Sequence, residues 1–455
     1  MNETIQEPIM LEAPEIKSSS DPSKPSVDAY YDVKTKEFLL KNEGGRWFGH
    51  NENQFKRVLR SLGYSTRFEA SSISEADSVI LEILNTKDVH FSGPLAGYKE
   101  GFYVANGTRF LVTSEPKIIT PIEGAWPTIN QLISGLLEST EEGIDQRHYF
   151  YGWLKVAYES LVAGEPRAGQ ALVIAGERGC GKSLCQAIIT EILGGRSAKP
   201  HAYMCGTTAF NSDLFGAEHL MLEDEQASTD IRARRNMGAH IKSITVNPTQ
   251  RLHAKGRDAL VVKPFWRLSI SLNSEPENLM VLPPIDDSLR DKLILLRGYK
   301  KPMPMPTATN EERRAFMTAL ESEYPAFVHF LVNYDIPPDL QCQRFGVTHY
   351  HHPEILEAVD SLSPEMRLLS LVDGELFSSG TAETWKGTAE ELERRLTRPD
   401  SQCAHEASRI LHYHTACGTY LGRLAGCKPE RIEQQRTAKK RLWRIKPPDD
   451  PDPEE

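Results

Sequence analysis

Apolar residues along the chain follow two spacings, one typical of buried strands and one typical of amphipathic helices. The run Ala171–Ala175 is continuous and partly β-branched, which predicts a buried parallel strand. Directly after it, apolar residues recur at helical spacing from Leu184 to Leu193. Two further runs, His219–Leu222 and Leu268–Leu272, predict more strands of the same kind. We therefore expect an α/β core built on a parallel sheet.

The same patterns divide the rest of the chain into regions. Residues 102–112 predict a β-hairpin about an Asn-Gly turn. We expect a small α+β accessory region at 27–124, a helical lead-in at 125–164, the α/β core at 165–346 and a further domain at 362–448. The ends, 1–26 and 449–455, are rich in Pro and charged residues, and we expect both to be disordered tails.

A loop with the composition of a phosphate-binding loop connects the first core strand to its helix. Its residues are Gly176, Glu177, Arg178, Gly179, Cys180, Gly181, Lys182 and Ser183. The glycines let successive backbone N–H groups point at one phosphate, and the helix N-terminus adds positive potential. Lys182 is expected to reach the β- and γ-phosphate oxygens, and Ser183 to ligate Mg²⁺. The strand, loop and helix predict a P-loop domain that takes ATP and Mg²⁺.

An acidic triplet follows the second core strand, where nucleotide hydrolysis requires carboxylates. Glu223, Asp224 and Glu225 come directly after the apolar run. In one register Asp224 belongs to the Mg²⁺ shell and Glu225 orients the attacking water; in the other, Glu223 and Asp224 share these roles. The sequence leaves both registers open. An acidic triplet in isolation is usually only a solvated turn, and its position after a strand favours the functional interpretation.

Polar and basic residues continue this pattern downstream. Asn273 ends the third core strand, where it is placed to contact a γ-phosphate, although Asn also favours Asx turns. The segment 231–257 carries seven Lys and Arg residues and no acidic one. Its end predicts a hairpin with His253, Lys255 and Arg257 near the tip, and cations there are typical of contacts with a phosphate backbone.

These elements, in this order and spacing, resemble the superfamily 3 helicases, and most closely the helicase portion of phage and plasmid primase-helicases. The resemblance covers residues 171–297 well and most of the chain more loosely. It implies an AAA+-like P-loop core that assembles into a ring, in which His253, Lys255 and Arg257 track DNA. Such proteins often carry a priming domain upstream, and no such pattern occurs here, so primer synthesis is not implied.

Arg290 follows the third strand within a short polar segment. In the family that the chain resembles, an arginine at this place reaches the ATP of the neighbouring subunit and neutralises charge on the γ-phosphoryl. The alternative is that Arg290 pairs with Asp286 or Asp287 on its own surface.

The region 362–448 contains a second nucleic-acid signal. Apolar positions predict one helix about Leu368–Val372, a capped helix at Thr388–Leu396 and a third helix about Thr419–Leu424. A basic β-wing follows, and its expected DNA contacts are Arg436, Lys439 and Lys440. Helix, capped helix, helix and wing resemble a winged-helix domain, which binds DNA in some proteins and protein in others.

Composition limits the remaining possibilities. The formal net charge is −10, so nucleic acid would be bound by local basic patches. No apolar stretch is long enough to span a bilayer and no signal pattern opens the chain, which predicts a cytoplasmic protein without membrane contact. The seven scattered cysteines are typical of reduced thiols. The neighbouring residues Cys403, His405, His412, His414 and Cys417 lack a C-x-x-C pair, so zinc is the weaker interpretation.

The sequence therefore predicts a DNA-stimulated ATPase and helicase of phage, plasmid or mobile-element replication. It would work as a homo-oligomeric ring on single-stranded DNA. The alternative is a nucleotide-switched initiator or loader, which uses ATP to assemble on origin duplex DNA without unwinding it.

Overall fold

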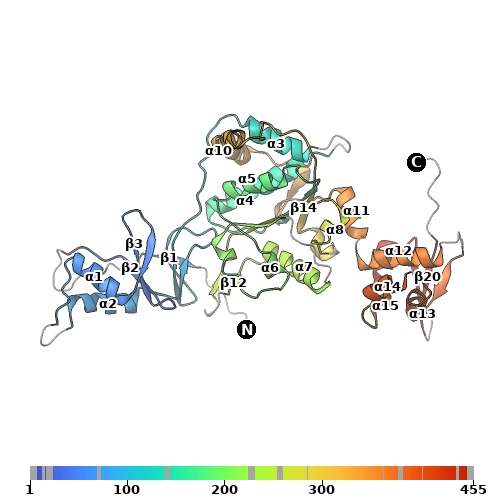
Figure 1. The fold of residues 1–455 in the computed structure, drawn as a ribbon, viewed down its shortest axis with the longest axis horizontal. Coiled ribbons are helices and arrows are strands. Elements are labelled where there is room, and N and C mark those ends of the chain that lie inside the picture. Colours follow the sequence, from blue (N-terminus) through green and yellow to red (C-terminus); the bar gives the residue numbers. More distant parts are fainter. Residues whose placement is uncertain are drawn as a thin grey trace. The chain divides into compact units, whose positions relative to one another are not determined.

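The chain divides into two compact units, Met1–His352 and Pro353–Glu455. Figure 1 shows their elements in a computed structural model. The structure describes residues 8–12, 16, 24–68, 73–138, 144–223, 231–253, 260–283, 285–361, 363–377, 383–401, 403–436 and 440–447.

A five-stranded parallel sheet forms the centre of the first unit, as the apolar runs predicted. Its order is β10-β11-β14-β9-β15. In that order the strands are Ser197–Ala198, His219–Glu223, Arg267–Asn273, Ala171–Gly176 and Leu293–Gly298. All six residues of β9 are buried, as expected for a parallel strand covered on both faces. In Figure 1, α3, α4, α5 and α10 lie on one side of the sheet and α6 and α7 on the other.

The helices and hairpins around this sheet enclose one large apolar cluster, to which α3, α4, α5 and α10 all contribute. The helices are α3 (Pro127–Leu137), α4 (Arg147–Ala163), α5 (Lys182–Ile192), α6 (His201–Met204), α7 (Ile231–Val246), α8 (Pro276–Leu279), α9 (Asp287–Arg290) and α10 (Asn310–Asn333), with 3-10 turns at Leu214–Gly216 and Pro338–Leu340. The hairpins are β12–β13 (Gln250–Leu252, Leu260–Val262) and β16–β17 (Gln341–Cys342, Gly346–Val347). The predicted helical lead-in is thus the pair α3 and α4.

Two four-stranded sheets and two helices form the accessory region. The first sheet has the order β4-β3-β2-β5 (Trp47–His50, Glu37–Lys41, Ala29–Asp32, Asp88–Val89), and the second has the order β1-β7-β8-β6 (Ile9–Leu11, Gly101–Ala105, Thr108–Val112, Phe91–Gly93). The helices are α1 (Glu52–Ser61) and α2 (Glu75–Thr86). The predicted Asn-Gly hairpin is confirmed, because Asn106 and Gly107 both have positive φ between β7 and β8.

The expectation of a disordered N-terminal tail is wrong for part of that stretch. Ile9–Leu11 pairs with β7 as strand β1, and Ile16 is fully buried and accepts a backbone hydrogen bond from Val27. These short apolar segments are stabilised by a sheet and a core that lie far along the chain, so composition around them did not reveal their order.

The segment that leaves the accessory sheet docks on the core. The Ala96 N–H donates to the Phe215 carbonyl (2.7 Å), and the Ala96 carbonyl accepts from the Phe265 N–H (3.0 Å). The Gly97 N–H donates to the fully buried carboxylate of Glu218 (2.8 Å), which also pairs with Arg196. The accessory region is therefore tied to the residues that precede β11 and β14.

The second unit has its own apolar core, which contains Leu392, Tyr420 and Trp443. Its elements are α11 (Pro353–Ser361), α12 (Pro364–Leu376), β18 (Trp385–Gly387), α13 (Ala389–Leu396), α14 (Ala404–Ile410), α15 (Ala416–Cys427), β19 (Ile432–Arg436) and β20 (Arg441–Ile445). The strands form an antiparallel sheet in the order β18-β20-β19. The predicted capping box of Thr388 and Glu391 is present, and the third predicted helix, expected about Thr419–Leu424, is longer in the structure, as α15.

Candidate nucleotide and DNA site

The loop predicted to bind phosphate, called the phosphate loop below, joins β9 to α5 at the carboxyl edge of the parallel sheet. Gly179 and Gly181 have φ values of +76° and +105°, which an L side chain rarely adopts. Gly176 is needed for a different reason, because a Cβ there would lie 2.3 Å from the Gly298 carbonyl oxygen on β15. Within the described structure, no side chain caps the N-terminus of α5, so its first backbone N–H groups remain available to a ligand.

Lys182 is buried within this loop without a carboxylate partner in the described structure. Its ammonium donates to the carbonyls of Gly176 and Glu177, both at 2.9 Å, and to Asn273 Oδ1 at 3.1 Å. The Cys180 thiol lies 3.8 Å away. Three neutral oxygens thus occupy the three donors of a full positive charge, an arrangement that an anionic ligand can replace. The pairing of Asn273 with Gly176 across β14 and β9 brings the predicted amide to the loop.

A buried polar network fixes α5 to the two strands that carry the predicted acidic and amide residues. Gln186 Nε2 donates to the Leu222 carbonyl (3.1 Å) and to Ser269 Oγ (2.7 Å). The ring nitrogens of His219 lie 2.7 Å from Ser269 Oγ and 2.7 Å from Thr190 Oγ1. Burial lowers the pKa of His219 to about 3, so it is neutral at pH 7. The sequence did not reveal this network, because its members are ordinary polar residues far apart in the chain.

Glu223 ends β11, and Asp224 and Glu225 lie outside the described residues. Side chains alternate along a strand, so Glu223 shares with His219 the face of β11 that contacts α5. The Glu223 side chain is a quarter exposed, and its carboxylate lies 3.7 Å from Lys199 Nζ. Which of the two acidic registers applies therefore stays a prediction. Ser183, the predicted Mg²⁺ ligand, is exposed in the first turn of α5.

Arg290 lies at the opposite edge of the sheet from the phosphate loop. Leu293, which begins β15, is paired with Ala171, the first residue of β9, whereas the loop follows the last. The Arg290 side chain is exposed, and within the described part of the chain it forms no ion pair with Asp286 or Asp287. Burial, with the nearby charges of His349 and Arg290, lowers the pKa of His351 to about 4.

The predicted basic hairpin is present as β12 and β13, but Lys255 and Arg257 lie outside the described residues. His253 is exposed at its described end, and its ring lies 5.4 Å from that of Phe210, which is 42% exposed. Asn211 holds this end in place, because its side chain accepts from the His253 N–H (2.7 Å) and donates to the Arg251 carbonyl (3.0 Å). Phe210 was not predicted from the sequence, where its one signal was its isolation within a polar loop.

Not all of the predicted basic segment is available to a ligand. Arg234 is buried and donates to the Leu282 carbonyl (2.9 and 3.2 Å). Lys242 contacts Asp286 and Ser288. These two cations therefore bind α7 to the segment before β15, and the local excess of positive charge is smaller than the sequence indicated.

In the second unit, the expected DNA contacts Arg436 and Lys440 are exposed, and Lys439 lies outside the described residues. Arg436 and Arg441 are directly opposite each other on β19 and β20. Like charges in such a cross-strand pair repel, and an anion would relieve the repulsion. By contrast, Arg444 and Lys446 both pair with Glu433.

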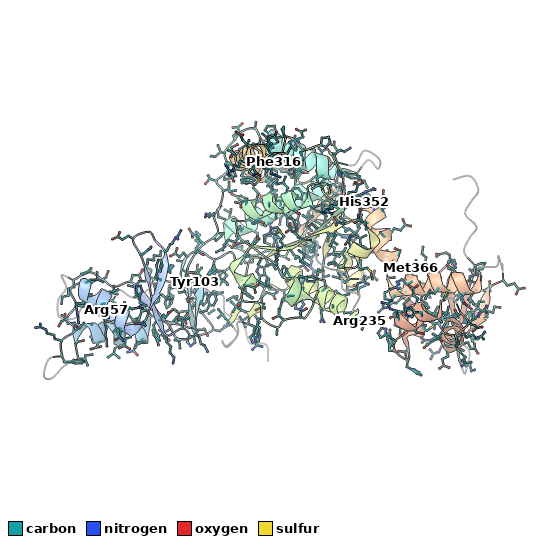
Figure 2. The ribbon with its side chains drawn as sticks, viewed as in Figure 1. Arg57, Tyr103, Arg235, Phe316, His352 and Met366 are labelled. Carbon is teal, nitrogen blue, oxygen red and sulfur yellow. The ribbon has the colours of Figure 1, made fainter. Side chains whose placement is uncertain are left out.

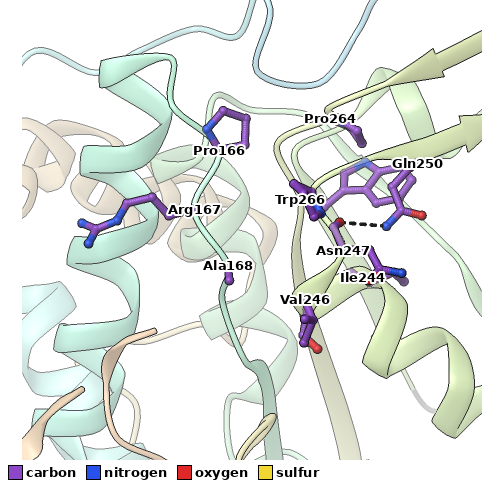
Figure 3. Close-up of a pocket in the computed structure, with 11 residues that line it drawn as sticks. Pro166, Arg167, Ala168, Ile244, Val246, Asn247, Gln250, Pro264 and Trp266 are labelled. Carbon is purple, nitrogen blue, oxygen red and sulfur yellow. Dashed lines mark hydrogen bonds between the residues drawn. The ribbon is translucent and has the colours of Figure 1, made fainter. Parts of the chain in front are cut away.

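Two rival sites find no support. Among the described residues, no three His, Cys, Asp or Glu side chains gather as metal ligands would, so the zinc interpretation of Cys403 to Cys417 gains nothing. A hollow of about 40 Å³ lies at the amino ends of β9 and β14, away from the phosphate loop (Figure 3). Arg167 is the charged residue among those lining it, and in Figure 3 its side chain extends away from the hollow. That volume holds one or two waters and no nucleotide.

Comparisons with known proteins establish the fold and leave the function open. A family model described as a family of unknown function, DUF5906, matches residues 174–290, about a quarter of the chain. No curated protein matches. The apo C-terminal region of NrS-1 is similar at a TM-score of 0.52 and 12% identity, over 92% of this chain and 96% of that one. The A form of the same region gives 0.51 and 14%, with the same coverage.

A further structure, SCCmec type IV Cch, described as an active helicase, has a TM-score of 0.31 at 13% identity, over 94% of this chain and 74% of that one. That score is too low to define a common fold. The chain therefore shares its fold with the NrS-1 region, and its function has to be argued from the site. Within the described residues, no helix combines the length and hydropathy that a bilayer span requires.

Proposed function

We propose that this protein is an ATP-hydrolysing, ring-forming DNA translocase and helicase of the replication machinery of a phage, plasmid or other mobile element. ATP with Mg²⁺ would bind at the phosphate loop of one subunit. Arg290 of the neighbouring subunit would complete the site, and the β12–β13 hairpins would follow one DNA strand.

The residues of the loop fit a magnesium nucleotide. Among the described residues, the buried charge of Lys182 is satisfied only by neutral oxygens, and no side chain caps the N-terminus of α5. Ser183 is the residue that would hold Mg²⁺, together with a carboxylate from the Glu223–Glu225 triplet. Bound Mg²⁺ would neutralise the phosphate oxygens, while Asn273 would stay within reach of the γ-phosphate because it already contacts Lys182.

One observation carries the ring proposal: Arg290 and the phosphate loop lie at opposite edges of the same sheet. The six residues of β9 separate the two edges by about 16 Å. An arginine side chain extends roughly 7 Å, so Arg290 is too far from its own nucleotide and has a role in hydrolysis only when another subunit supplies the ATP. The Arg290 side chain is exposed and has no carboxylate partner among the described residues, which is consistent with a contact across a subunit interface.

The proposed DNA contacts combine cations with an aromatic ring. His253 and Phe210 form an exposed pair at the base of the basic hairpin, and rings of this kind stack on bases of any sequence. Lys255 and Arg257 would add phosphate contacts nearer the tip. In the second unit, we interpret the order α12, β18, α13, α14, α15, β19, β20 as a winged helix whose wing carries Arg436, Lys439 and Lys440.

The alternative function, a sequence-specific initiator or loader, is disfavoured by one feature of that unit. The exposed positions of α15 include Thr419, Gly422, Arg423 and Gly426, and Arg423 is paired with Glu365. A helix that reads base edges needs Arg, Asn or Gln side chains free to reach them. We therefore expect phosphate contacts of low sequence specificity.

The test is ATP hydrolysis by the full chain with and without single-stranded DNA of unrelated sequences, beside Lys182→Ala and Arg290→Ala. We expect DNA to stimulate the wild-type rate, and both variants to lose hydrolysis by about 10³-fold or more. Phe210→Ala should weaken the stimulation, and the control Phe68→Ala, at another exposed phenylalanine, should not. If DNA does not stimulate hydrolysis and Arg290→Ala retains the wild-type rate, the helicase proposal is refuted and the nucleotide-switched initiator or loader is supported.

A further inference from the structure

The segment that carries Arg290 is too short to hold its own conformation. α9 contains four residues, Asp287–Arg290, with Asp286 as its N-cap. A helix of one turn has little stability in isolation, because the conformational entropy lost in forming the first turn exceeds the free energy gained from its hydrogen bonds. The direction in which Arg290 projects therefore depends on what α9 packs against.

That support comes from α7. Arg234 donates to the Leu282 carbonyl on the chain leading into α9. One turn further along α7, a Cβ at Gly238 would lie 3.2 Å from Pro283 Cβ and 3.4 Å from Leu289 Cδ1, so the two segments are in close contact there. Leu289 itself is buried, which fixes one side of α9.

Lys242, one further turn along α7, completes this support. Its ammonium lies 3.6 Å from Asp286 Oδ1 and also donates to Ser288 Oγ. Asp286 Oδ1 accepts from the Ser288 backbone N–H (3.0 Å), so Lys242 contacts both groups that form the cap of α9. Although partial burial raises the pKa of Asp286, the Ser288 hydrogen bonds and the charge of Lys242 outweigh it and hold that pKa below its usual value. Arg234, Gly238 and Lys242 recur every fourth residue, so they share one face of α7.

The position of α7 in the chain gives this face a consequence. α7 follows the acidic triplet and leads directly into β12, the first strand of the DNA hairpin. One rigid helix thus connects the hairpin of a subunit to the arginine that the same subunit offers to its neighbour.

We propose that Lys242 is a positioning residue, which holds the cap of α9 so that Arg290 meets the ATP of the neighbouring subunit. The inference rests on the proposed function, because it assigns Arg290 to a site on another subunit. Lys242 acts through Arg290 and touches neither nucleotide nor DNA. The side chains of Lys242 and Asp286 are 36% and 62% exposed, so the pair contributes little to folding stability and its loss leaves the fold intact.

The first measurement is steady-state ATP hydrolysis by Lys242→Ala. We expect kcat to fall about tenfold with KM for ATP unchanged, since the defect lies in charge stabilisation during reaction. Arg235→Ala is the matched control, because Arg235 is an exposed cation on the same helix (Figure 2), and it should retain the wild-type rate. The charge swap Lys242→Asp with Asp286→Lys should recover most of the activity, which a DNA contact by Lys242 would not allow.

Mixed rings provide the decisive test. Lys242→Ala keeps an intact phosphate loop, and Lys182→Ala keeps a well-placed Arg290. In an equal random mixture, about a quarter of the interfaces join an intact loop to a well-placed arginine, so the rate should exceed the average of the separate proteins about fivefold. A role of Lys242 within its own subunit predicts no such gain.

A parallel mixture of Arg290→Ala with Lys182→Ala separates the two proposals. If it gains activity while Lys242→Ala hydrolyses like wild type or shows no gain on mixing, the role of Lys242 is refuted and the trans arginine stands. If neither mixture gains activity, the trans arginine itself fails, and the inference fails with it. Gain in both mixtures, with the control unaffected, supports both.

Discussion

Two buried cations lie at opposite ends of the same parallel sheet, and they differ in what surrounds them. Lys182 follows the carboxyl end of β9, and Arg267 opens the amino end of β14. Their residues are 6% and 2% exposed, and within the described structure neither has a carboxylate partner. Burial of an uncompensated charge is therefore common to both ends.

The difference is in access. Lys182 lies under the exposed residues Glu177–Gly179, and each of its acceptors is a neutral oxygen that a phosphate can replace. Arg267 is enclosed: its guanidinium lies 4.9 Å from the Phe265 ring centroid, and a Cβ on Gly169 would lie 2.6 Å from its Nε. It donates to the carbonyls of Arg167 (3.0 Å) and Trp266 (2.9 Å), while Nε and one amino group have no partner among the described residues.

Burial lowers the pKa of Arg267 to about 10, and the charge of Arg167 adds to the effect. Among the described residues Arg267 is almost fully buried, and the nearby hollow is of water size. An uncompensated buried charge therefore indicates a binding site only where a ligand from solution can reach it. At the other end the same feature has a structural role.

The largest expected effect is on hydrolysis, in Lys182→Met. Loss of the ammonium removes the group that would meet the developing phosphate charge, so the rate should fall by about 10³-fold or more, as in Lys182→Ala. The thermal midpoint should stay within about 3 °C of wild type, because a buried charge is exchanged for an apolar chain of similar length. Lys300→Met, at an exposed lysine, is the control for both measurements.

Glu218→Gln tests the structural role of buried charges at the amino end of the sheet. Glu218 is fully buried, accepts from Gly97 and pairs with Arg196, so neutralising it leaves Arg196 without its counterion. We expect about 3 kcal/mol less free energy of unfolding in urea, with hydrolysis per folded molecule unchanged. Glu406→Gln breaks an exposed pair with Arg367 and should cost under about 1 kcal/mol. If Glu218→Gln and Glu406→Gln lower the free energy of unfolding equally, the structural role assigned to Glu218 is contradicted.

Gly97→Ala should cost about 2 to 3 kcal/mol, also measured by urea denaturation. Gly97 has φ +80°, and a Cβ there would lie 2.5 Å from Phe265 Cβ, so strain and overpacking add. Gly107→Ala is matched in backbone, with φ +74° and open space around the added methyl, and should cost about 1 kcal/mol. If the two variants lose the same stability, the docking of residue 97 on the core contributes nothing.

Because of His219, the free energy of unfolding should depend on pH. Its folded pKa of about 3 lies below the ordinary 6.5, so the unfolded chain takes up a proton first as the pH falls. Stability from this residue is therefore complete above pH 6.5 and is lost toward pH 3, by about 1.4 kcal/mol per pH unit. Between pH 6.5 and 5 the loss is about 2 kcal/mol, and His219→Gln should remove that part of the slope. An unchanged slope would show that His219 titrates normally.

The smallest effect is expected for Arg267→Met, the same replacement as at Lys182. The two lost hydrogen bonds and the relieved desolvation of the guanidinium act in opposite directions, so the free energy of unfolding should change by under about 1 kcal/mol. ATP hydrolysis should match wild type. A tenfold drop in hydrolysis would give Arg267 a functional role and end the distinction between the two ends of the sheet.

Local sequence patterns were sufficient to predict the elements whose formation depends on residues close together in the chain. The continuous apolar runs became β9, β11 and β14, because strands buried on both faces need apolar side chains throughout. The Asn106–Gly107 hairpin and the Thr388 capping box also formed as predicted, since turns and caps depend on neighbouring residues. Strands β1 and β18 were not predicted, because each is only three residues long and exists through pairing with a distant strand.

The sequence by itself determined that this chain has a parallel α/β core, a glycine-rich loop with Lys182 and a strand ending in Asn273, because these follow from residue type and spacing. Only the tertiary structure decided that Asn273 contacts Lys182, that Arg234 and Lys242 support α9, and that Arg290 lies at the opposite sheet edge from its own loop. These contacts join residues tens of positions apart. Strand order and register set such distances, and neither is written in the local sequence.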